Sequence, residues 1–324
     1  MNAYIAGISS YLPEKKLTNF ELEKMVETSD EWIRTRSGIK ERRISAADQP
    51  TSELAIAAAK KALDAAHTKA SEVEAIIVAT ATPDMFFPST ACLVQAKIGA
   101  RKIISFDISA GCSGWLYALS VANAFVKTGY DNILVIGAEE LSKITDYTDR
   151  GTCVLLGDGA GAALLKKTSE ERGILSTYFA ADGSYGDLLY MPAGGTRMPA
   201  TEETLKKRYH YLKMEGNKVF KVAVRAMYES AVKVLSKAKV KTEDIALLVP
   251  HQANIRIIEA TAKRLNISMD KVGINLDRYG NTSAASIPIG LDEAASSGRI
   301  KKGDLVLMVA FGAGFTWGGV LIKW

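Results

Sequence analysis

The stretch IISFDISAGCSGWLYALSVANAFVK, residues 103–127, changes its pattern part-way along. Its first six residues are mostly apolar and β-branched, a composition typical of a strand buried on both faces. From residue 114 onward, apolar residues recur at helical spacing among many alanines, which favours a helix. The small residues around Cys112 allow the backbone to turn sharply between the two. We therefore predict a buried strand that leads straight into a helix, with Cys112 at the turn.

The same order of elements recurs in the second half of the chain. Asn281 follows Cys112 by 169 residues, and His251 follows Thr80 by 171 residues. A steady offset over five segments predicts a duplication, in which each half is a βαβ-rich unit of an α/β protein. The halves are expected at about residues 1–167 and 168–324. The matched pairs are IIVAT (76–80) with LLVPH (247–251), IISFDI (103–108) with KVGINL (271–276), the helices 114–127 and 282–296, ILVIG (133–137) with LVLMV (305–309), and CVLLGDGAGAALL (153–165) with FTWGGVLIKW (315–324).

Several further elements are expected. Residues 54–66 have the pattern of a helix, and CVLL (153–156) that of a buried strand. Thr18 and Glu21 have the spacing of a capping box that opens a helix toward Met25. Gly and Pro cluster in MPAGGTRMP (191–199), which is followed by the charged run EETLKKRYHY. That stretch predicts an exposed loop or flap between the halves.

The bulk composition is that of a globular protein. The chain has 324 residues, of which 48% are hydrophobic and 24% charged, so the composition argues against disorder. The net charge of +5 is mild, and no dense run of Lys and Arg and no interleaving of basic with aromatic residues indicates nucleic-acid binding. No apolar run reaches membrane-spanning length, and MNAYIAGISS lacks the pattern of a signal peptide. We therefore expect a cytoplasmic protein that binds neither nucleic acid nor membrane.

The three cysteines do not suggest a metal site or a disulfide framework. None of them forms a Cys-x-x-Cys pair, and Cys92 and Cys153 lie in apolar runs that predict core positions. Cys112 is different, because the N-terminus of a helix carries positive partial charge, which favours the thiolate. A buried structural cysteine is the alternative reading of this segment. Cys112 is therefore a candidate nucleophile.

Two polar residues occupy positions related to Cys112 by the duplication. His251 directly follows the strand LLVP, and the ends of buried strands are where open α/β sheets place their ligands. Asn281 lies in YGNTSAAS, the counterpart of the Cys112 turn. A backbone-capped histidine and a helix N-cap asparagine are the alternatives. If the halves pack with pseudo-twofold symmetry, the three side chains converge in one pocket as a nucleophile with a general-base or oxyanion pair.

The segment GDGAGA (157–162) resembles a dinucleotide-binding fingerprint but does not match it. Its third glycine comes one residue early, and strand-like residues follow where a helix should begin. Close strand packing or a bulge is the better explanation of these glycines.

Several motifs, spread over nearly the whole chain, resemble those of the type III β-ketoacyl-[acyl-carrier-protein] synthases and follow one another in the order found in that family. This resemblance implies the thiolase fold, with two βαβαβαββ halves in a five-layer αβαβα arrangement. It also implies a homodimer with a Cys-His-Asn site and without a metal or a bound organic cofactor. The motifs are TSDEWIRTRSGI (28–39), FPSTAC (87–92), TDRGT (148–152), LGDGAGA (156–162), GNKVFK (216–221), VPHQANIRI (249–257) and YGNTSAAS (279–286).

The resemblance also implies roles for individual positions. Cys112, His251 and Asn281 are the expected catalytic residues, and the backbone N–H groups of Cys112 and Ala313 form the expected oxyanion hole. Phe87 and Phe311 are expected at the acyl pocket, where Trp115 would add bulk. Contacts with coenzyme A carry over onto Trp32, Arg36, Arg150, Met214, Gly216, Asn217, Phe220, Ala253, Asn254 and Arg256. Docking of the carrier protein carries over onto Gln252, Ala253, Asn254, Ile255 and Arg256.

Some positions depart from the family pattern. The nucleophile turn reads AGCSGW where the family more often has AACAGF, and position 37 is Ser where the family has Thr. Ala313 stands where a glycine is usual, which would restrict the backbone if φ were positive there. The loop around residues 196–211 is somewhat longer than usual. No departure removes a catalytic group, and together they leave the primer preference open.

The implied reaction is a decarboxylative condensation of a short acyl-CoA with malonyl-carrier protein, by way of an acylated Cys112. Its carrier protein is acidic, so a basic patch is expected on the enzyme, with a solvated charge as the alternative for each member. Three other functions stay open: an acyltransferase or polyketide-type starter synthase of the same fold, a papain-like protease, and a non-catalytic carrier-binding homologue. The candidates for the basic patch are Lys221, Arg225, Arg256, Lys263 and Arg264.

Overall fold

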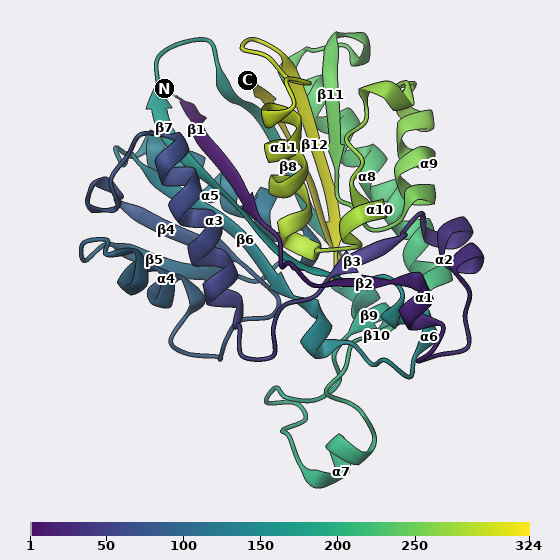
Figure 1. Cartoon of the computed structure of the whole chain (residues 1–324). Helices are drawn as coiled ribbons and strands as arrows, with labels where there is room; N and C mark the ends of the chain where they lie inside the picture. The colour runs from purple at the N-terminus through teal and green to yellow at the C-terminus, as the bar shows by residue number, and fades with distance from the viewer. Residues whose placement is uncertain (1) are drawn as a thin grey trace.

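The computed structural model describes residues 2–324 and contains two main β-sheets (Figure 1). The first sheet has the strand order β1-β7-β6-β4-β5, and the second has the order β8-β13-β12-β11. The first half runs through β1 (Asn2–Tyr11), α3 (Thr51–Ala65), β4 (Ala75–Ala79), α4 (Thr90–Ile98), β5 (Ile104–Ile108), α5 (Gly114–Lys127), β6 (Ile133–Glu140) and β7 (Asp158–Thr168). The second half runs through β8 (Gly173–Ala181), α8 (Gly216–Ala238), β11 (Ile245–Pro250), α9 (Ile255–Leu265), α11 (Ser286–Ser296), β12 (Leu305–Gly312) and β13 (Thr316–Lys323).

The two sheets repeat one topology, as the duplicated sequence predicts. In the first, β4 lies parallel to β5 and β6, while β7 is antiparallel to both β6 and β1. In the second, β11 lies parallel to β12, and β13 is antiparallel to both β12 and β8. The predicted boundary between residues 167 and 168 falls at the end of β7. The division of the chain into two domains stays a prediction.

Five layers result from this packing. Helices α3 and α4 cover the outer face of the first sheet, and α8 and α9 cover the outer face of the second. Helices α5 and α11 lie between the sheets, in a core that both sheets line, as Figure 1 shows for α11. The alanine-rich face of α3 lets this helix approach the sheet closely, since Ala55, Ala58, Ala59 and Ala62 are all fully buried.

Two predicted strands are corrected. Residues 153–156 do not form a strand, because Asp149 accepts the N–H of Gly151 and caps a short helix, α6 (Arg150–Cys153). The KVGINL segment is reduced to one parallel bridge between Val272 and Leu248, and α10 (Leu276–Tyr279) begins within it. The helix expected over 282–296 begins at Ser286, after a 3₁₀ turn, η7 (Ser283–Ala285).

The GDGAGA segment forms the start of β7, as its strand reading predicts. A Cβ on Gly161 would lie 2.6 Å from the Cβ of Pro288 in α11, so this glycine permits close packing of strand on helix. The predicted capping box of Thr18 and Glu21 is present, but its helix, α1 (Asn19–Leu22), has only four residues.

A segment of the first half crosses to the second. It contains β2 (Lys16–Thr18), α1, α2 (Asp30–Ser37) and β3 (Glu41–Arg43). Leu22, Ile33 and Ile39 are fully buried in the core that α8 and α9 share with the second sheet. The N–H of Lys40 donates to the carbonyl of Asp277, which ties the segment to α10. This crossing places α2 beside α9, where both contribute to one cleft.

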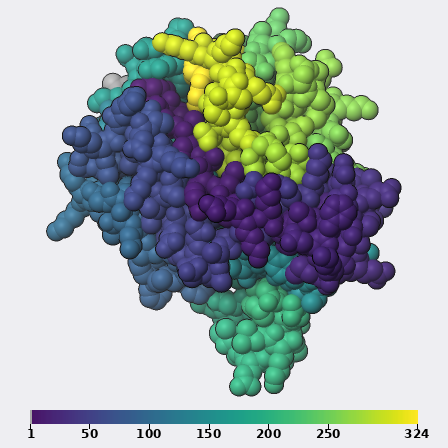
Figure 2. Space-filling view, viewed as in Figure 1, coloured from purple at the N-terminus to yellow at the C-terminus, as the bar shows by residue number. Residues whose placement is uncertain are grey.

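The predicted flap protrudes from the body at the bottom of Figures 1 and 2. It lies between β9 (Leu189–Tyr190) and β10 (Lys213–Met214) and includes α7 (Glu202–Lys206). Its base is held by Asp146, whose buried carboxylate accepts two hydrogen bonds from Arg208, at 2.6 and 2.9 Å. Within residues 2–324, no helix has the length and apolarity needed to cross a membrane.

Candidate active site

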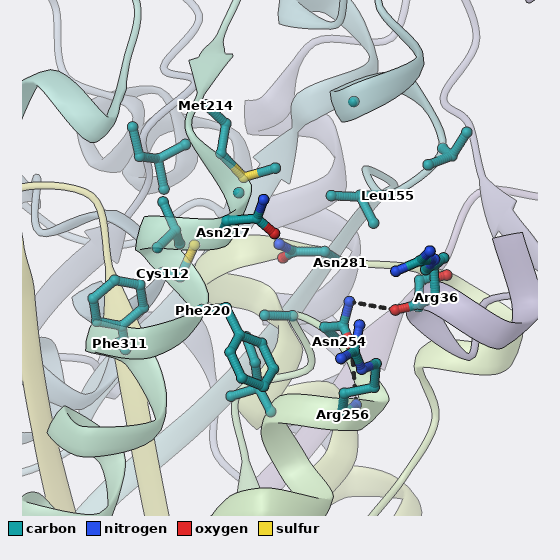
Figure 3. A pocket seen from close by; sticks show the side chains of 18 of the residues that line it. Arg36, Cys112, Leu155, Met214, Asn217, Phe220, Asn254, Arg256, Asn281 and Phe311 are labelled. Atoms are coloured by element: carbon teal, nitrogen blue, oxygen red, sulfur yellow. Dashed lines mark hydrogen bonds between the residues drawn. The ribbon is translucent and has the colours of Figure 1, made fainter.

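Cys112, His251 and Asn281 line one cleft of about 710 Å³. They reach it from different elements: Cys112 from the turn before α5, His251 from the end of β11, and Asn281 from the turn before η7. Figure 3 shows the sulfur of Cys112 and the amide of Asn281 at the inner part of this cleft. The structure therefore brings together the three side chains that the duplication and the resemblance single out.

The turn around Cys112 is a 3₁₀ turn, η2 (Gly111–Ser113), that runs directly into α5. Gly111 has φ +50°, and a Cβ added there would lie 2.7 Å from the nitrogen of Ala313. A Cβ on Gly312 would collide with the backbone nitrogen of Cys112. These two glycines let the end of β12 and Ala313, the next residue, lie against the nucleophile turn.

Burial raises the pKa of the Cys112 thiol to about 12. The nearby Ser283 hydroxyl lowers the pKa of this thiol but does not offset the loss of solvation. The helix N-terminus favours the thiolate, but desolvation of the charged form acts against it and has the larger effect on the pKa of Cys112. The free enzyme holds a neutral thiol, which must lose its proton as it reacts.

His251 is fixed as a neutral imidazole. Its backbone N–H donates to the carbonyl of Val309, and its Nδ1 lies 2.7 Å from the hydroxyl of Ser286 in α11. Burial lowers the pKa of His251 to about 3. When the Ser286 hydroxyl donates to Nδ1, the ring hydrogen resides on Nε2, which leaves an N–H donor free.

Asn281 belongs to the second half but is held by the first. Its backbone N–H donates to the carbonyl of Leu155 at 2.8 Å, and its carbonyl accepts the N–H of Gly157 at 3.0 Å. Its side-chain oxygen accepts the N–H of Ser283 at 2.8 Å. Because that oxygen is occupied, the Asn281 amide can offer its N–H₂ group to the cleft.

The residues expected to contact coenzyme A form the outer part of the cleft. Nine of the ten line it directly, and Arg150 contributes by stacking its guanidinium 4.9 Å from the ring of Trp32. Arg256 lies 5.5 Å from the ring of Phe220 in the same way. Asn254 caps α9, and its amide donates to the carbonyl of Arg36, as the dashed lines in Figure 3 show. The nine lining residues are Trp32, Arg36, Met214, Gly216, Asn217, Phe220, Ala253, Asn254 and Arg256.

Two residues that were expected at the acyl pocket do not line this cleft. Trp115 is fully buried between the sheets, with its indole N–H directed at the carbonyl of Val135, so it does not line the cleft. Trp115 is the second residue of α5, and its side chain points into the core. Its closeness to Cys112 in the sequence therefore does not place it at the cleft. Phe87 is 84% exposed and does not line the cleft of its own chain, whereas Phe311 does.

One expected docking residue is structural. Gln252 is fully buried, and its amide donates to the carbonyls of Pro250 and Gly273 while it accepts the N–H groups of Asn275 and Leu276. Its polar atoms are all used inside the protein, so it is not available to a carrier protein. Ile255 is half-buried against Gly38, whereas Arg256 is exposed at the mouth of the cleft.

Three residues behind the cleft were not predicted from the sequence: Ser283, Ser286 and Glu139. The two serines belong to the motif YGNTSAAS, in which only Asn281 was considered. Glu139 is fully buried and is the second-last residue of β6, two positions after the apolar run ILVIG. A carboxylate at the end of a buried parallel strand was a signal of the same kind as His251.

Comparisons with known proteins agree with this geometry. Residues 106–183 match the family described as 3-oxoacyl-[acyl-carrier-protein] synthase III, and residues 235–324 match its C-terminal part. A β-ketoacyl-[acyl-carrier-protein] synthase III of Caldanaerobacter subterraneus is 60% identical over 99% of this chain and 98% of that protein. The crystal structure of the synthase III of Aquifex aeolicus superposes with a TM-score of 0.92 at 50% identity, over 99% of this chain and 100% of that one.

The chain belongs to the 3-oxoacyl-[acyl-carrier-protein] synthase III family. It therefore has the thiolase fold, as the resemblance implied, and is an acyltransferase-type condensing enzyme of fatty acid biosynthesis. Membership of the synthase III family supports a role in the initiating condensation. The papain-like protease and the non-catalytic homologue are thereby excluded.

A synthase of polyketide biosynthesis shares the fold. The priming β-ketosynthase of the R1128 polyketide pathway superposes with a TM-score of 0.91 at 31% identity, over 99% of this chain and 95% of that one. The fold of the synthase III family therefore does not by itself define the primer or the carrier.

Proposed function

We propose that this enzyme condenses a short acyl-CoA primer with malonyl-[acyl-carrier-protein], by way of an acylated Cys112, and releases 3-oxoacyl-[acyl-carrier-protein], coenzyme A and CO₂. The observation that carries the proposal is the meeting of Cys112, His251 and Asn281 in one cleft with an aromatic and cationic mouth. A nucleophile and two hydrogen-bond donors are the groups that acyl transfer and decarboxylation require.

The first half-reaction is acyl transfer to sulfur. Cys112 loses its proton and attacks the thioester carbonyl, coenzyme A leaves as the thiol, and the acyl group stays on the enzyme. The proton that Cys112 loses departs with the sulfur of coenzyme A. His251 does not take it up, because burial lowers the pKa of that ring to about 3. The N–H groups of Cys112 and Ala313 would bind the oxyanion that forms on the thioester carbonyl.

The second half-reaction is decarboxylation followed by carbon–carbon bond formation. His251, with its hydrogen on Nε2, and the N–H₂ group of Asn281 donate to the thioester oxygen of the malonyl group. That oxygen gains negative charge as CO₂ departs, so both donors stabilise the enolate more than the ground state. The enolate carbon then attacks the acyl-Cys112 thioester and frees the sulfur. This chemistry needs only side chains and backbone N–H groups, so we propose that no metal or organic cofactor takes part.

The mouth of the cleft suits a phosphorylated, partly aromatic ligand. Arg36 and Arg256 can bind phosphate oxygens bidentately. The Trp32 ring with Arg150 stacked on it offers a flat surface for a planar base. Acyl-CoA has both features, and we propose that it is a substrate and not a resident cofactor.

The carrier protein is proposed to dock on α8 and α9, which pack side by side next to this mouth. Both helices present exposed cations on this side, and an acidic partner would be attracted to them. The cations proposed to make this docking face are Lys221, Arg225, Arg256, Lys263 and Arg264.

The working form is proposed to be a homodimer. Strand β5 pairs only with β4 among the described strands and so has a free edge. Met85, Phe86 and Phe87 are exposed in the loop that precedes α4, which packs on β5. A second copy of the chain would cover this apolar surface, and Phe87 would then floor the acyl pocket of the partner subunit.

The test is a two-step assay with acyl-CoA and radiolabelled malonyl-carrier protein. We expect mass spectrometry to find one acyl group on Cys112, and CO₂ to be released in proportion to 3-oxoacyl product. Cys112→Ser should lose most of the acylation, since an alcohol at neutral pH is a much weaker nucleophile than a thiolate. Acylation without CO₂ release would instead favour a plain acyltransferase.

The R1128 similarity makes a polyketide-type starter synthase the second candidate. It would use the same Cys112 with another carrier. Rates with carrier proteins of fatty acid and of polyketide synthesis, compared at equal concentration, discriminate the two. The compartment stays a prediction.

A further inference from the structure

Arg42 in β3 is fully buried, and the proposed mechanism does not use it. No Asp or Glu within residues 2–324 forms an ion pair with this side chain. Burial lowers the pKa of Arg42 to about 10, so the guanidinium stays charged at neutral pH. Burying a cation without a counter-charge is costly, and an apolar side chain of similar size would fill the space without this cost. Packing alone therefore does not account for an arginine here.

The guanidinium of Arg42 uses each of its four Nη hydrogens once. Nη1 donates to the carbonyl of Leu17 and to the side-chain oxygen of Asn19, both at 2.9 Å. Nη2 donates to the same Asn19 oxygen at 3.0 Å and to the carbonyl of Val154 at 2.7 Å. Arg42 therefore joins the segment that crosses between the halves to the end of α6.

The bond to Val154 bears on the turn that holds Asn281. Val154 is the C-cap residue of α6, where helix carbonyls lack partners and a cation is a favourable donor. The next three residues hold Asn281: Leu155 accepts its N–H, Leu156 forms a parallel bridge with it, and Gly157 donates to its carbonyl. Val154 and Leu155 also line the cleft, as Figure 3 shows for Leu155. The position of the Asn281 amide in the cleft therefore depends on this turn.

Two glycines let Arg42 pack against both segments that this bridge joins. A Cβ on Gly157 would lie 3.1 Å from the Cβ of Arg42, and a Cβ on Gly280 would lie 3.0 Å from it. Gly280 directly precedes Asn281 and has φ +67°, a conformation that glycine adopts readily. Arg42 therefore contacts the bridge from behind on both sides, in addition to its bond to Val154.

We infer that Arg42 is a positioning residue for Asn281: it fixes the turn of residues 154–157 from behind, so that the Asn281 amide faces the substrate during decarboxylation. The inference deepens the proposed function, on which it rests for the role of Asn281. Arg42 does not line the cleft, so it acts through the turn and not by contact with the substrate.

The first measurement compares acyl loading with CO₂ release in Arg42→Met. Methionine fills much of the space but has no hydrogen to donate, so the turn loses its bond to Nη2. Release of CO₂ per acylated Cys112 should slow about tenfold, less than when the Asn281 amide is removed, because a displaced donor still contributes. Acyl loading should keep its wild-type rate, because Cys112 and the oxyanion N–H groups are unchanged. Counting acylated Cys112 by mass spectrometry corrects for any unfolded protein.

Two further readouts separate positioning from a general loss of stability. The acyl-CoA concentration that half-saturates loading should not change, because Asn19 keeps its bonds to Asp30 of α2 and to the carbonyl of Ile39. In the Asn281→Ala background, Arg42→Met should not slow CO₂ release further, because the donor that it positions is gone. A merely structural role would lower the rate by the same factor in both backgrounds.

Arg43→Met is the matched control for Arg42→Met. Arg43 is the next residue of β3, and its guanidinium also donates to backbone carbonyls. Those carbonyls belong to Pro13 and Glu14, outside the turn of residues 154–157. Arg43→Met should therefore release CO₂ at the wild-type rate.

Arg42→Lys is the conservative variant. Lysine keeps the charge and can donate to the carbonyl of Val154, but it lacks the fixed fork of the guanidinium. It should recover part of the CO₂ release that Arg42→Met loses, with acyl loading unchanged. If Arg42→Met does not fold, Arg42→Lys still tests the inference, since its CO₂ release should remain below that of wild type.

Hydrogen–deuterium exchange tests the same turn without any substrate. Peptides that contain the N–H groups of Gly157 and Asn281 should exchange about tenfold faster in Arg42→Met than in wild type, because local opening of the turn becomes easier. The same peptides should exchange at the wild-type rate in Arg43→Met. If exchange follows this order but the wild-type enzyme releases no CO₂, the proposed function is wrong and the positioning role of Arg42 stands.

Three results would each overturn the inference. One is wild-type CO₂ release per acylated Cys112 in Arg42→Met, and another is an equal loss of rate in the Asn281→Ala background. The third is unchanged exchange of the Gly157 and Asn281 N–H groups in Arg42→Met.

Discussion

At the scale of single residues, the site divides one reaction between a nucleophile and a pair of donors. We expect His251→Ala and Asn281→Ala still to form acyl-Cys112, because the thiol and both oxyanion N–H groups remain. Each should decarboxylate malonyl-carrier protein on the order of a hundredfold more slowly, the usual effect of removing one preorganised donor. Mass spectrometry of acyl loading and release of CO₂ measure the two steps separately. An Asn281→Ala variant that cannot be acylated but decarboxylates normally would reverse the assignment.

His251 also makes stability depend on pH. The unfolded chain binds a proton on this ring below about pH 6.5, whereas the folded chain binds it only near pH 3, because burial lowers the pKa. The unfolded state therefore gains protons first, so this contribution to stability is present above pH 6.5 and is lost as the pH falls. Between pH 6.5 and 5 we expect His251 to lower the free energy of unfolding by about 2 kcal/mol.

Urea unfolding of wild type and His251→Gln at these two pH values measures that contribution. Carboxyl groups change the stability of both proteins alike, so the difference between the proteins isolates His251. We expect the variant to lose less stability than wild type as the pH falls. An equal loss in both would show that the imidazole is not kept neutral by the fold.

At the scale of secondary-structure elements, α9 joins the active site to the docking face. Arg256 and Lys263 are seven residues apart on this helix and so share one side. Lys263→Glu should raise the KM for malonyl-carrier protein but leave acyl loading from CoA nearly unchanged, because Lys263 does not line the cleft. Arg256→Glu should impair both steps, since Arg256 does line it.

Salt provides the control for this prediction. The wild-type KM for the carrier should rise with ionic strength, because exposed charges are screened beyond about 8 Å at physiological salt. The KM of Lys263→Glu should depend less on salt. A carrier KM that is insensitive both to salt and to Lys263→Glu would exclude this side of α9 as the docking face.

At the scale of the whole molecule, the acyl pocket is proposed to need two chains. Phe87 is 84% exposed in the single chain, whereas Phe311 lines the cleft. If Phe87 floors the pocket of the partner subunit, Phe87→Ala should shift the preferred primer toward longer chains. Packing alone discriminates one methylene by about 1–3 kcal/mol, so kcat/KM for wild type should fall in steps across two- to five-carbon primers.

The measurement is kcat/KM for a series of acyl-CoA primers, together with the oligomeric state of each protein. The shift in primer preference should be seen only where the dimer is intact. An unchanged ranking in a dimeric Phe87→Ala variant, with octanoyl-CoA still rejected, would mean that Phe311 or another residue of the same chain limits the length.

The sequence by itself determined the duplicated α/β architecture. Hydrophobic periodicity and a constant offset between similar segments can both be recognised in the order of the residues, without knowledge of tertiary contacts. It also determined Cys112, His251 and Asn281, since each follows a strand or turn at a position related by the repeat. The strand predicted at 153–156 was wrong because Asp149, a few residues earlier, caps a helix there. The strand predicted for KVGINL forms only a single bridge in the structure. A short apolar run does not by itself show whether it will pair with a neighbouring strand over its whole length.

Only the tertiary structure decided the state and the surroundings of these residues. Burial sets the neutral thiol of Cys112 and the neutral imidazole of His251, and burial depends on which segments of the other half cover each group. Trp115 points into the core and Gln252 is used up by internal hydrogen bonds, which sequence adjacency to the site could not reveal. Glu139 accepts the N–H of Ala284 across 145 residues of sequence. Contacts of this kind have no local signature, because desolvation and hydrogen bonding act through space and not along the chain.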